Sequence, residues 1–266
     1  MIRLTALFLA SAALTFSATA ADLYAMSPAA MPVYDTSSSW TGFYAGVFGG
    51  AAFNPSDAGV IEIDQDLDGN FSEPLVAPLL GAFGSNFIGS NDAGFTGGIE
   101  AGYDYQMDSF VFGGVVDIAA VDYQSRQSAF SSTPASYTQQ TDIEYLATVR
   151  ARAGYLVTDD VLAYVHGGLA IGGVDTSFSS TNPNGRSRGG DDTMVGFQVG
   201  AGVETKVTSN VSIGLEYAYT NLGDTDFTTR FNNGPFAAVN PAGADLRGSD
   251  QTVDFHTVKA SLKYRF

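Results

Sequence analysis

From Thr41 to the last residue, the sequence repeats one pattern: apolar side chains alternate with small or polar ones, in segments of roughly ten residues, the length of a membrane-spanning strand. Because successive side chains of a strand point to opposite faces, each segment predicts a β-strand with one apolar and one polar face. We count eight such segments, at 41–53, 93–107, 110–122, 142–157, 161–174, 192–206, 211–222 and 251–266.

The connections between these segments alternate in length. Three are short and four are long: 107–109, 158–160 and 207–210 against 54–92, 123–141, 175–191 and 223–250. Short turns at one end and long loops at the other are typical of an outer-membrane barrel. We therefore expect an all-β fold, an eight-stranded antiparallel up-and-down transmembrane β-barrel, with its short turns in the periplasm and its long loops extracellular. A soluble β-sandwich would also alternate, but it would not explain the alternation in loop length.

The N-terminal stretch MIRLTALFLASAALTFSATA has the three parts of a secretory signal peptide: one arginine, an apolar run, and Ala18-Thr19-Ala20 as an A-x-A cleavage site. The apolar run is too short to cross a bilayer as a helix. The residues that follow are rich in Ala, Ser and Pro and show no period. We predict a signal peptide at 1–20, a flexible periplasmic segment at 21–39 and the outer-membrane β-barrel at 40–266.

Composition restricts the partners. The chain has no cysteine, so it cannot use the disulfide framework of small secreted domains. Its formal net charge is −16. Phosphate contacts need Lys and Arg, so a chain this acidic is a poor binder of nucleic acid. We expect no nucleic-acid partner.

Charged side chains recur on the polar face of the strands, which would point into the barrel lumen. The acids expected there are Glu100, Asp104, Asp117, Glu144, Glu204 and Glu216, and the bases are Arg150, Arg152, Lys259, Lys263 and Arg265. Unpaired buried charges are costly, so these groups should pair, with the two arginines as anchors. They form either a salt-bridged plug or an ion path. An eight-stranded interior has little room beyond its side chains, which favours the plug.

The last segment, VKASLKYRF, has one apolar and one charged face. The apolar face comprises Val258, Ala260, Leu262, Tyr264 and Phe266. We expect it to face lipid while the bases between meet the acidic lumen wall. The strand should close the barrel against the first segment, since in lipid an open edge would expose unpaired backbone groups. Tyrosines near strand ends predict aromatic girdles at the membrane interfaces.

Several stretches carry a resemblance to a known family: WTGFYAGVFGG (40–50), GFTGGIEAGYDYQ (94–106), TVRARAGY (148–155), HGGLAIGG (166–173), VGFQVGAGVETKVTSNVSIGLEYAY (195–219) and the final VKASLKYRF. The sequence resembles the small eight-stranded outer-membrane barrel proteins of alphaproteobacteria, of the OmpA-like type, which include surface antigens and haemin-binding proteins. The stretches cover all the expected strands except most of the third. The resemblance implies a structural or surface-interacting role without catalytic residues. It also implies that the apolar face of the last strand is an assembly signal for the outer-membrane assembly machinery.

The first long connection is acidic and departs from the family pattern. It contains seven acids and no base of its own: Asp57, Glu62, Asp64, Asp66, Asp68, Glu73 and Asp92. Within it, DQDLDGN (64–70) has the spacing of the front half of a calcium loop. Leu75 stands where that loop would need a bidentate glutamate. The segment is either a solvated acidic loop, the interpretation that the missing ligand favours, or a calcium site with Asp64, Asp66 and Asp68 as ligands.

Enzymatic and haem-binding functions depend on two histidines. A nucleophile needs a base within hydrogen-bond reach, and neither His166 nor His256 has a serine two residues on in its strand. By parity, His166 should point into the lumen and His256 outward near the loop-side rim. We predict no enzyme.

Haem binding would need a His, Tyr or Met side chain as an axial ligand. No local motif indicates such a ligand, so haem binding rests on the resemblance alone.

We therefore expect an integral protein of the outer membrane of a Gram-negative cell. Its expected role is structural: it stabilises the envelope and presents acidic extracellular loops. Its expected partners are lipid and lipopolysaccharide, the assembly machinery, and a host or surface ligand that the sequence does not identify. The alternatives are a small ion-conducting porin and a haemin- or ligand-binding surface receptor. No resident cofactor is expected, with calcium and haem as the alternatives.

Overall fold

The computed structural model describes residues 39–182, 184–188 and 190–266. Eight long strands form the barrel: β1 (Gly42–Phe53), β4 (Gly94–Met107), β5 (Phe110–Ser131), β6 (Ala135–Thr158), β7 (Val161–Ser180), β9 (Asp191–Lys206), β10 (Val211–Asp224) and β13 (Thr252–Arg265). The expected all-β fold and its eight strands are confirmed. The expected signal peptide and nearly all of the expected periplasmic segment lie outside the described residues.

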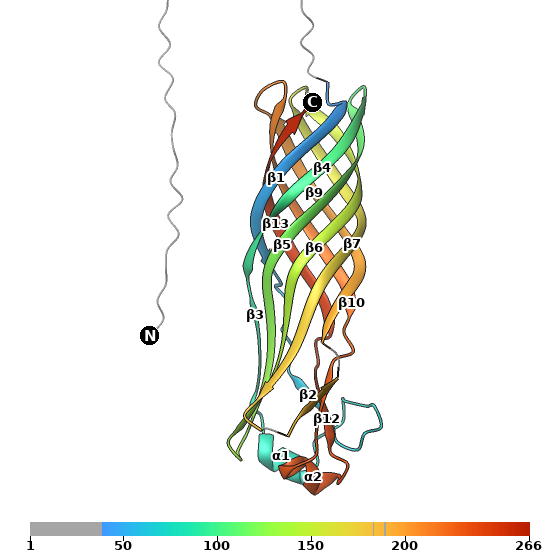
Figure 1. Ribbon diagram of the computed structural model, residues 1–266. Helices are drawn as coiled ribbons and strands as arrows, with labels where there is room; N and C mark the ends of the chain where they lie inside the picture. The colour runs from blue at the N-terminus through green and yellow to red at the C-terminus, as the bar shows by residue number, and fades with distance from the viewer. Residues whose placement is uncertain (1–38, 183, 189) are drawn as a thin grey trace, which may run out of the picture. The chain divides into compact units, whose positions relative to one another are not determined.

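The eight strands pair with their neighbours into a closed antiparallel ring (Figure 1). Each is paired on both sides, in the order β4-β1-β13-β10-β9-β7-β6-β5 and back to β4. The last strand closes on the first from Tyr44↔Arg265 to Phe53↔His256. This closure leaves no open edge in the ring, as a membrane requires.

Glycine allows two of these strands to approach each other closely. A Cβ built on Gly168 would lie 2.1 Å from the carbonyl oxygen of Val149 on β6, whereas one on Gly167 would meet nothing closer than 3.6 Å. The glycine-rich polar face thus lets strand backbones approach where a side chain would not fit.

Beyond the ring, β5 and β6 continue as one long hairpin and pair as far as Ser131↔Ala135. The expected loop at 123–141 is therefore wrong in its extent: all but 132–134 is strand. The residues of this stretch are mostly Ser, Thr and Gln, and they lie between two of the expected alternating segments. They are strand residues here because they pair with each other, and β3 (Phe87–Asp92) adds to the β5 side.

The remaining long connections fold into a cap beyond the same end of the barrel. A four-stranded sheet, in the order β2-β12-β11-β8, is joined by two short helices (Figure 1). These elements are β2 (Ile61–Asp64), α1 (Ala77–Phe83), β8 (Arg186–Arg188), β11 (Thr228–Phe231), α2 (Gly234–Val239) and β12 (Ala244–Gly248). The core of the cap contains Ile63, Phe83, Phe231, Phe236 and Leu246, together with Tyr137 of the hairpin. None of the described helices is long and apolar enough to cross a membrane.

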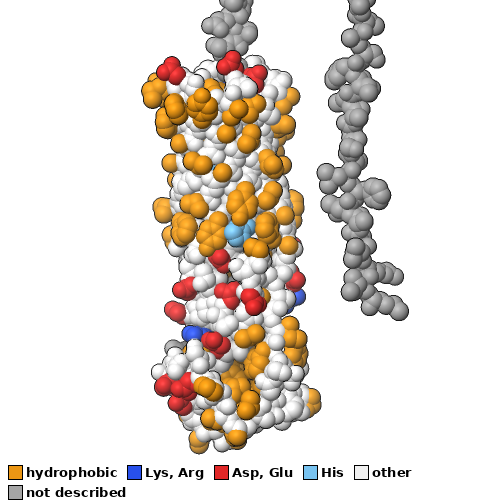
Figure 2. Space-filling view, turned by 180° about the vertical axis from the view of Figure 1, so that it is seen from behind, with side chains coloured by type: hydrophobic (Ala, Val, Ile, Leu, Met, Phe, Trp, Pro, Cys, Tyr) orange, Lys and Arg blue, Asp and Glu red, His pale blue; other side chains and the backbone are white. Residues whose placement is uncertain are grey.

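The outer wall of the barrel carries a band of exposed apolar side chains, which Figure 2 shows from behind. Phe43, Val47, Val165 and Val203 are at least half exposed, although they are strand residues of a folded protein. Acidic side chains begin where the band ends toward the cap. A band of this kind is what a lipid-facing wall requires.

Candidate functional site: the barrel lumen

Arg150 on β6 lies inside the barrel and pairs with two carboxylates. It donates to Asp117 on the neighbouring strand β5 and, over 2.8 Å, to Glu216 on β10 across the lumen. His166 lies beside the same guanidinium, with its Nδ1 3.1 Å from Arg150 Nη1. Because all four side chains are nearly inaccessible to solvent, the arginine compensates charge that water does not reach.

Arg152, two residues further along the same face, repeats the arrangement one layer nearer the short turns. Its Nε donates to Asp104 over 2.8 Å and its Nη1 donates to Glu204 over 3.0 Å. The guanidinium also lies 5.1 Å from the ring centre of Tyr44 and 5.0 Å from that of Tyr164. This forked, stacked geometry is one that Arg can make and Lys cannot.

The last strand supplies the other bases. Lys259 lies 2.9 Å from Glu216, and Lys263 lies 3.1 Å from Glu204 and 3.5 Å from Glu100. Arg265 donates to Asp104 over 2.8 Å. The charged face of the last segment thus meets acids from three other strands, the adjacent β10 and the more distant β9 and β4.

We call this set the ion network: Glu100, Asp104, Asp117, Arg150, Arg152, Glu204, Glu216, Lys259, Lys263 and Arg265. All of its members are buried. Glu144, the remaining residue that the sequence assigned to the lumen, is exposed. It is the extra residue of a β-bulge, left without a partner between Ile143↔Val174 and Tyr145↔Gly173. Its expected place in the lumen was therefore wrong.

The bulge has a second consequence, because one extra residue exchanges the two faces of a strand. Ile143, whose parity in the segment 142–157 would place it on the lipid side, is buried inside. Leu146, on the other side of the bulge, keeps the lumen parity of Arg150 and is buried too. Both belong to an apolar layer that fills the lumen between the ion network and the cap. The layer also contains Phe48, Ala52, Ala119, Val121, Tyr123, Ala170, Val174, Leu222, Val253 and Phe255.

The opposite end of the lumen is covered by Trp40, which is fully buried against Val111, Leu162 and Tyr164. Its indole nitrogen donates to the carbonyl of Asp159 in the short turn between β6 and β7. Arg265 donates to its carbonyl oxygen. This contact was not predicted from the sequence. The one feature that could have indicated it is the single tryptophan of the chain, which lies directly before the first strand.

The acidic connection has partners that the sequence did not reveal. Glu62 lies 3.4 Å from Arg247 on β12, and Asp92 lies 3.2 Å from Arg126 on β5. The connection has no base of its own, but the fold brings bases to it from other segments. These surface pairs are partly exposed, so each contributes little to stability.

The three expected calcium ligands lie together at the end of β2. One carboxylate oxygen from each of Asp64, Asp66 and Asp68 falls within 4.8 Å of the others. The two oxygens of Asp64 accept hydrogen bonds from the backbone N–H groups of Leu67 and Gly69. The cluster therefore has the spacing of a cation site, while its buried member already has backbone partners.

The assembly-signal residues and the second histidine lie on the outer wall. Val258, Leu262, Tyr264 and Phe266 are exposed, as is Ala260. His256 lies near the cap end of the same strand.

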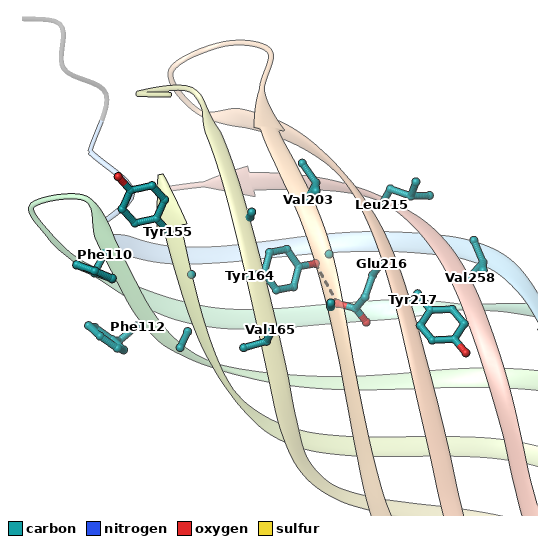
Figure 3. A pocket seen from close by; sticks show the side chains of 15 residues that line it. Phe110, Phe112, Tyr155, Tyr164, Val165, Val203, Leu215, Glu216, Tyr217 and Val258 are labelled. Carbon is teal, nitrogen blue, oxygen red and sulfur yellow. Dashed lines mark hydrogen bonds between the residues drawn. The ribbon is translucent and has the colours of Figure 1, made fainter. Parts of the chain in front are cut away.

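The outer wall also has a shallow groove of about 910 Å³ (Figure 3). Its wall includes Phe110, Phe112, Tyr155, Val165, Val203, Leu215, Tyr217 and Val258. An apolar groove on this wall faces lipid chains.

Comparison with known proteins agrees with this architecture. Residues 6–266 match the family described as outer membrane protein beta-barrel domain. The 31 kDa outer-membrane immunogenic protein of Brucella melitensis is 32% identical over 266 residues, which cover 97% of this chain and 98% of that protein. The 22 kDa outer membrane protein of Rhizobium leguminosarum is 31% identical over 148 residues, 56% of this chain and 61% of that protein.

Among solved structures, the outer membrane protein OprG of Pseudomonas aeruginosa aligns with a TM-score of 0.46 and 12% identity, covering 85% of this chain and 97% of that one. Neisserial surface protein A aligns with a TM-score of 0.37 and 16% identity, covering 85% and 98%.

Proposed function

Since the chain belongs to the outer membrane protein beta-barrel domain family and lies in the outer membrane, we propose that it is a structural, non-conducting barrel. It supports the envelope and presents its cap at the cell surface. The observation that carries the proposal is the filling of the lumen, where three successive layers of side chains lie between the short turns and the cap.

Each layer opposes ion passage in its own way. Trp40 covers the short-turn end. The ion network fixes its charges on one another, so a passing ion would have to replace existing partners. The apolar layer beyond it consists of hydrophobic side chains, and burying an unpaired charge among them costs several kcal/mol, on the order of the desolvation penalty of one ion. The porin alternative would need all three layers to open.

The proposal places the cap outside the cell and the short turns in the periplasm. Because the chain has no cysteine, a single cysteine reports its own accessibility. Ser72→Cys in the cap should react with a membrane-impermeant maleimide on intact cells, and Ser209→Cys in a short turn should react only after the outer membrane is broken. The reverse pattern would contradict the orientation.

The envelope role predicts an interaction with lipopolysaccharide. We infer that divalent cations bridge the acids of the surface connections to lipopolysaccharide phosphates, because the chain is strongly acidic and most of its acids lie outside the lumen. Neutralising the seven acids of the connection 54–92 should make cells expressing the variant more sensitive to a chelator than cells expressing the parent protein. Equal sensitivity, with equal protein in the membrane, would count against this role.

We further propose that the apolar face of the last strand is the assembly signal. Phe266→Ala should lower the amount of folded protein in the outer membrane, whereas Ser261→Ala, on the lumen side of the same strand, should not.

A haemin- or ligand-binding receptor remains the alternative function. A spectral titration with haemin distinguishes it, since an axial protein ligand shifts the absorption band of the haem.

A further inference from the structure

Four aromatic side chains form a continuous row on the outer wall, near the rim that faces the cap. We call this row the aromatic ledge: Phe53 on β1, His256 on β13, and Tyr217 and Tyr219 on β10. The register places Phe53, His256 and Tyr219 side by side on adjacent strands. The imidazole stacks on the rings of Phe53 and Tyr217 at centroid distances of 5.9 and 5.7 Å, and the Tyr219 ring lies tilted against it at 5.1 Å.

A polar row borders the ledge on its cap side. Asp254 accepts hydrogen bonds from the Tyr219 hydroxyl and from the Asn54 amide, each over 3.0 Å. The Asn221 amide donates to the same tyrosine oxygen. The ledge and this row thus present flat rings beside a carboxylate and two amides.

The ledge lies where the apolar band ends. His256 is the partly exposed one of the two histidines, and Figure 2 shows a histidine where hydrophobic side chains give way to acidic ones. This level of a membrane protein contacts lipid headgroups. A group bound there would have its chains against the apolar band and its head against the ledge.

The other rim of the barrel provides an internal comparison. Its rings also pair, as in Phe43 with Tyr103, Phe110 with Tyr155, and Tyr264 with Phe266. Within the described part of the chain, the hydroxyls of these three tyrosines hydrogen-bond to no protein group. That rim is an ordinary girdle, in which the amphipathic ring alone suffices. The ledge has, in addition, a stacked imidazole and hydroxyls that are fixed by polar partners.

The two rims of the barrel lie in the two leaflets of the outer membrane, and these leaflets differ in their lipids. The inner leaflet is phospholipid, and the outer leaflet contains glycolipid with a sugar headgroup. A sugar presents a face of C–H groups to an aromatic ring and hydroxyl or amide groups at its edge. Carboxylates such as Asp254 accept hydrogen bonds from those groups but repel a bare phosphate.

We propose that the aromatic ledge and its polar row bind the hexosamine headgroup of an outer-leaflet glycolipid, through the sugar rather than through its phosphates. The exposed parts of the Tyr219 and His256 rings would contact the sugar face, and Asp254 would accept from its edge. The proposal uses the orientation given above and is independent of whether the lumen conducts.

The test is lipid retention by the purified full chain, measured by native mass spectrometry after equal exposure to lipid A, dephosphorylated lipid A or phosphatidylglycerol. The parent protein should retain both glycolipids in preference to phosphatidylglycerol. Tyr219→Ala and His256→Ala should each lower glycolipid retention about fivefold to tenfold, the worth of one aromatic contact. Tyr155→Ala, at the opposite rim, is the matched control and should retain as much as the parent.

Three results would overturn the proposal. Equal retention of phosphatidylglycerol would make the ledge a plain girdle, and loss of binding on dephosphorylation would assign recognition to the phosphates. Unchanged retention in both ledge variants would place the glycolipid elsewhere. Heat-dependent gel mobility shows that each variant is folded, and Tyr219→Phe, which keeps the ring, provides a second measurement if an alanine variant does not fold.

Discussion

Removing Arg152 should destabilise the barrel more than removing any surface charge. In Arg152→Gln, Asp104 and Glu204 stay fully buried but lose the guanidinium that bonds to both. Breaking a buried pair by removing one partner costs about 3–5 kcal/mol. Arg265 still reaches Asp104 at 2.8 Å and Lys263 still reaches Glu204 at 3.1 Å, so we expect the lower end, about 3 kcal/mol.

The assay is equilibrium urea unfolding of the full chain refolded into lipid vesicles, followed by gel mobility. Arg126→Gln is the matched control, because it removes the same group from a partly exposed pair with Asp92. It should change the free energy of unfolding by about 0–1 kcal/mol. A loss in Arg152→Gln no larger than that of the control would refute the account of the ion network.

If the cost arises from stranded carboxylates, neutralising one of them should recover part of it. Arg152→Met combined with Glu204→Gln leaves one buried carboxylate without the guanidinium instead of two, while Lys263 keeps Glu100 and Arg265 keeps Asp104. The double variant should therefore be more stable than Arg152→Met alone, since apolar replacement of a buried pair is often close to neutral. A double variant less stable than either single one would show that the pair is not coupled as described.

Three further perturbations test other parts of the structure. Gly168→Ala should lower the refolding yield, because its Cβ would lie 2.1 Å from a backbone carbonyl, whereas the adjacent Gly167→Ala, with 3.6 Å of room, should refold like the parent. Burial raises the pKa of the Asp250 carboxyl, and the negative charge of the neighbouring Asp254 raises it further. The carboxyl therefore stabilises the folded state at low pH, and this contribution is lost as the pH rises through the pKa of the folded state. Asp250→Asn should therefore protect the cap from protease near neutral pH and have no effect below the ordinary pKa of aspartate; equal protection at both pH values would contradict this. Calorimetry should show calcium heat at millimolar concentration that disappears in Asp66→Asn if the cluster binds calcium, and no such heat would exclude that site.

The sequence predicted the barrel because the bilayer imposes a strict requirement on each strand. A membrane strand must place apolar side chains outward at every second position, so Val195, Val199 and Val203 could be assigned from parity alone, and all three are exposed. The lumen bases of the last strand followed from the same rule.

The wrong predictions concern features that the alternation of apolar and polar residues does not encode. A single extra residue at Glu144 exchanged the faces beyond it, which moved Ile143 into the lumen and Glu144 out of it. The apolar layer was not predicted, because the inward face of each strand was expected to be polar. The cap joins segments as distant as Glu62 and Arg247, and no local pattern predicts such a contact.

The most direct test of the sealed lumen is the conductance of the purified, refolded full chain in planar bilayers, recorded with and without Ca²⁺ over a range of salt concentrations. The three layers predict silence or rare small openings under every condition. Steady conductance that rises in proportion to salt would mean that ions pass the ion network and the apolar layer. The barrel would then be a small porin.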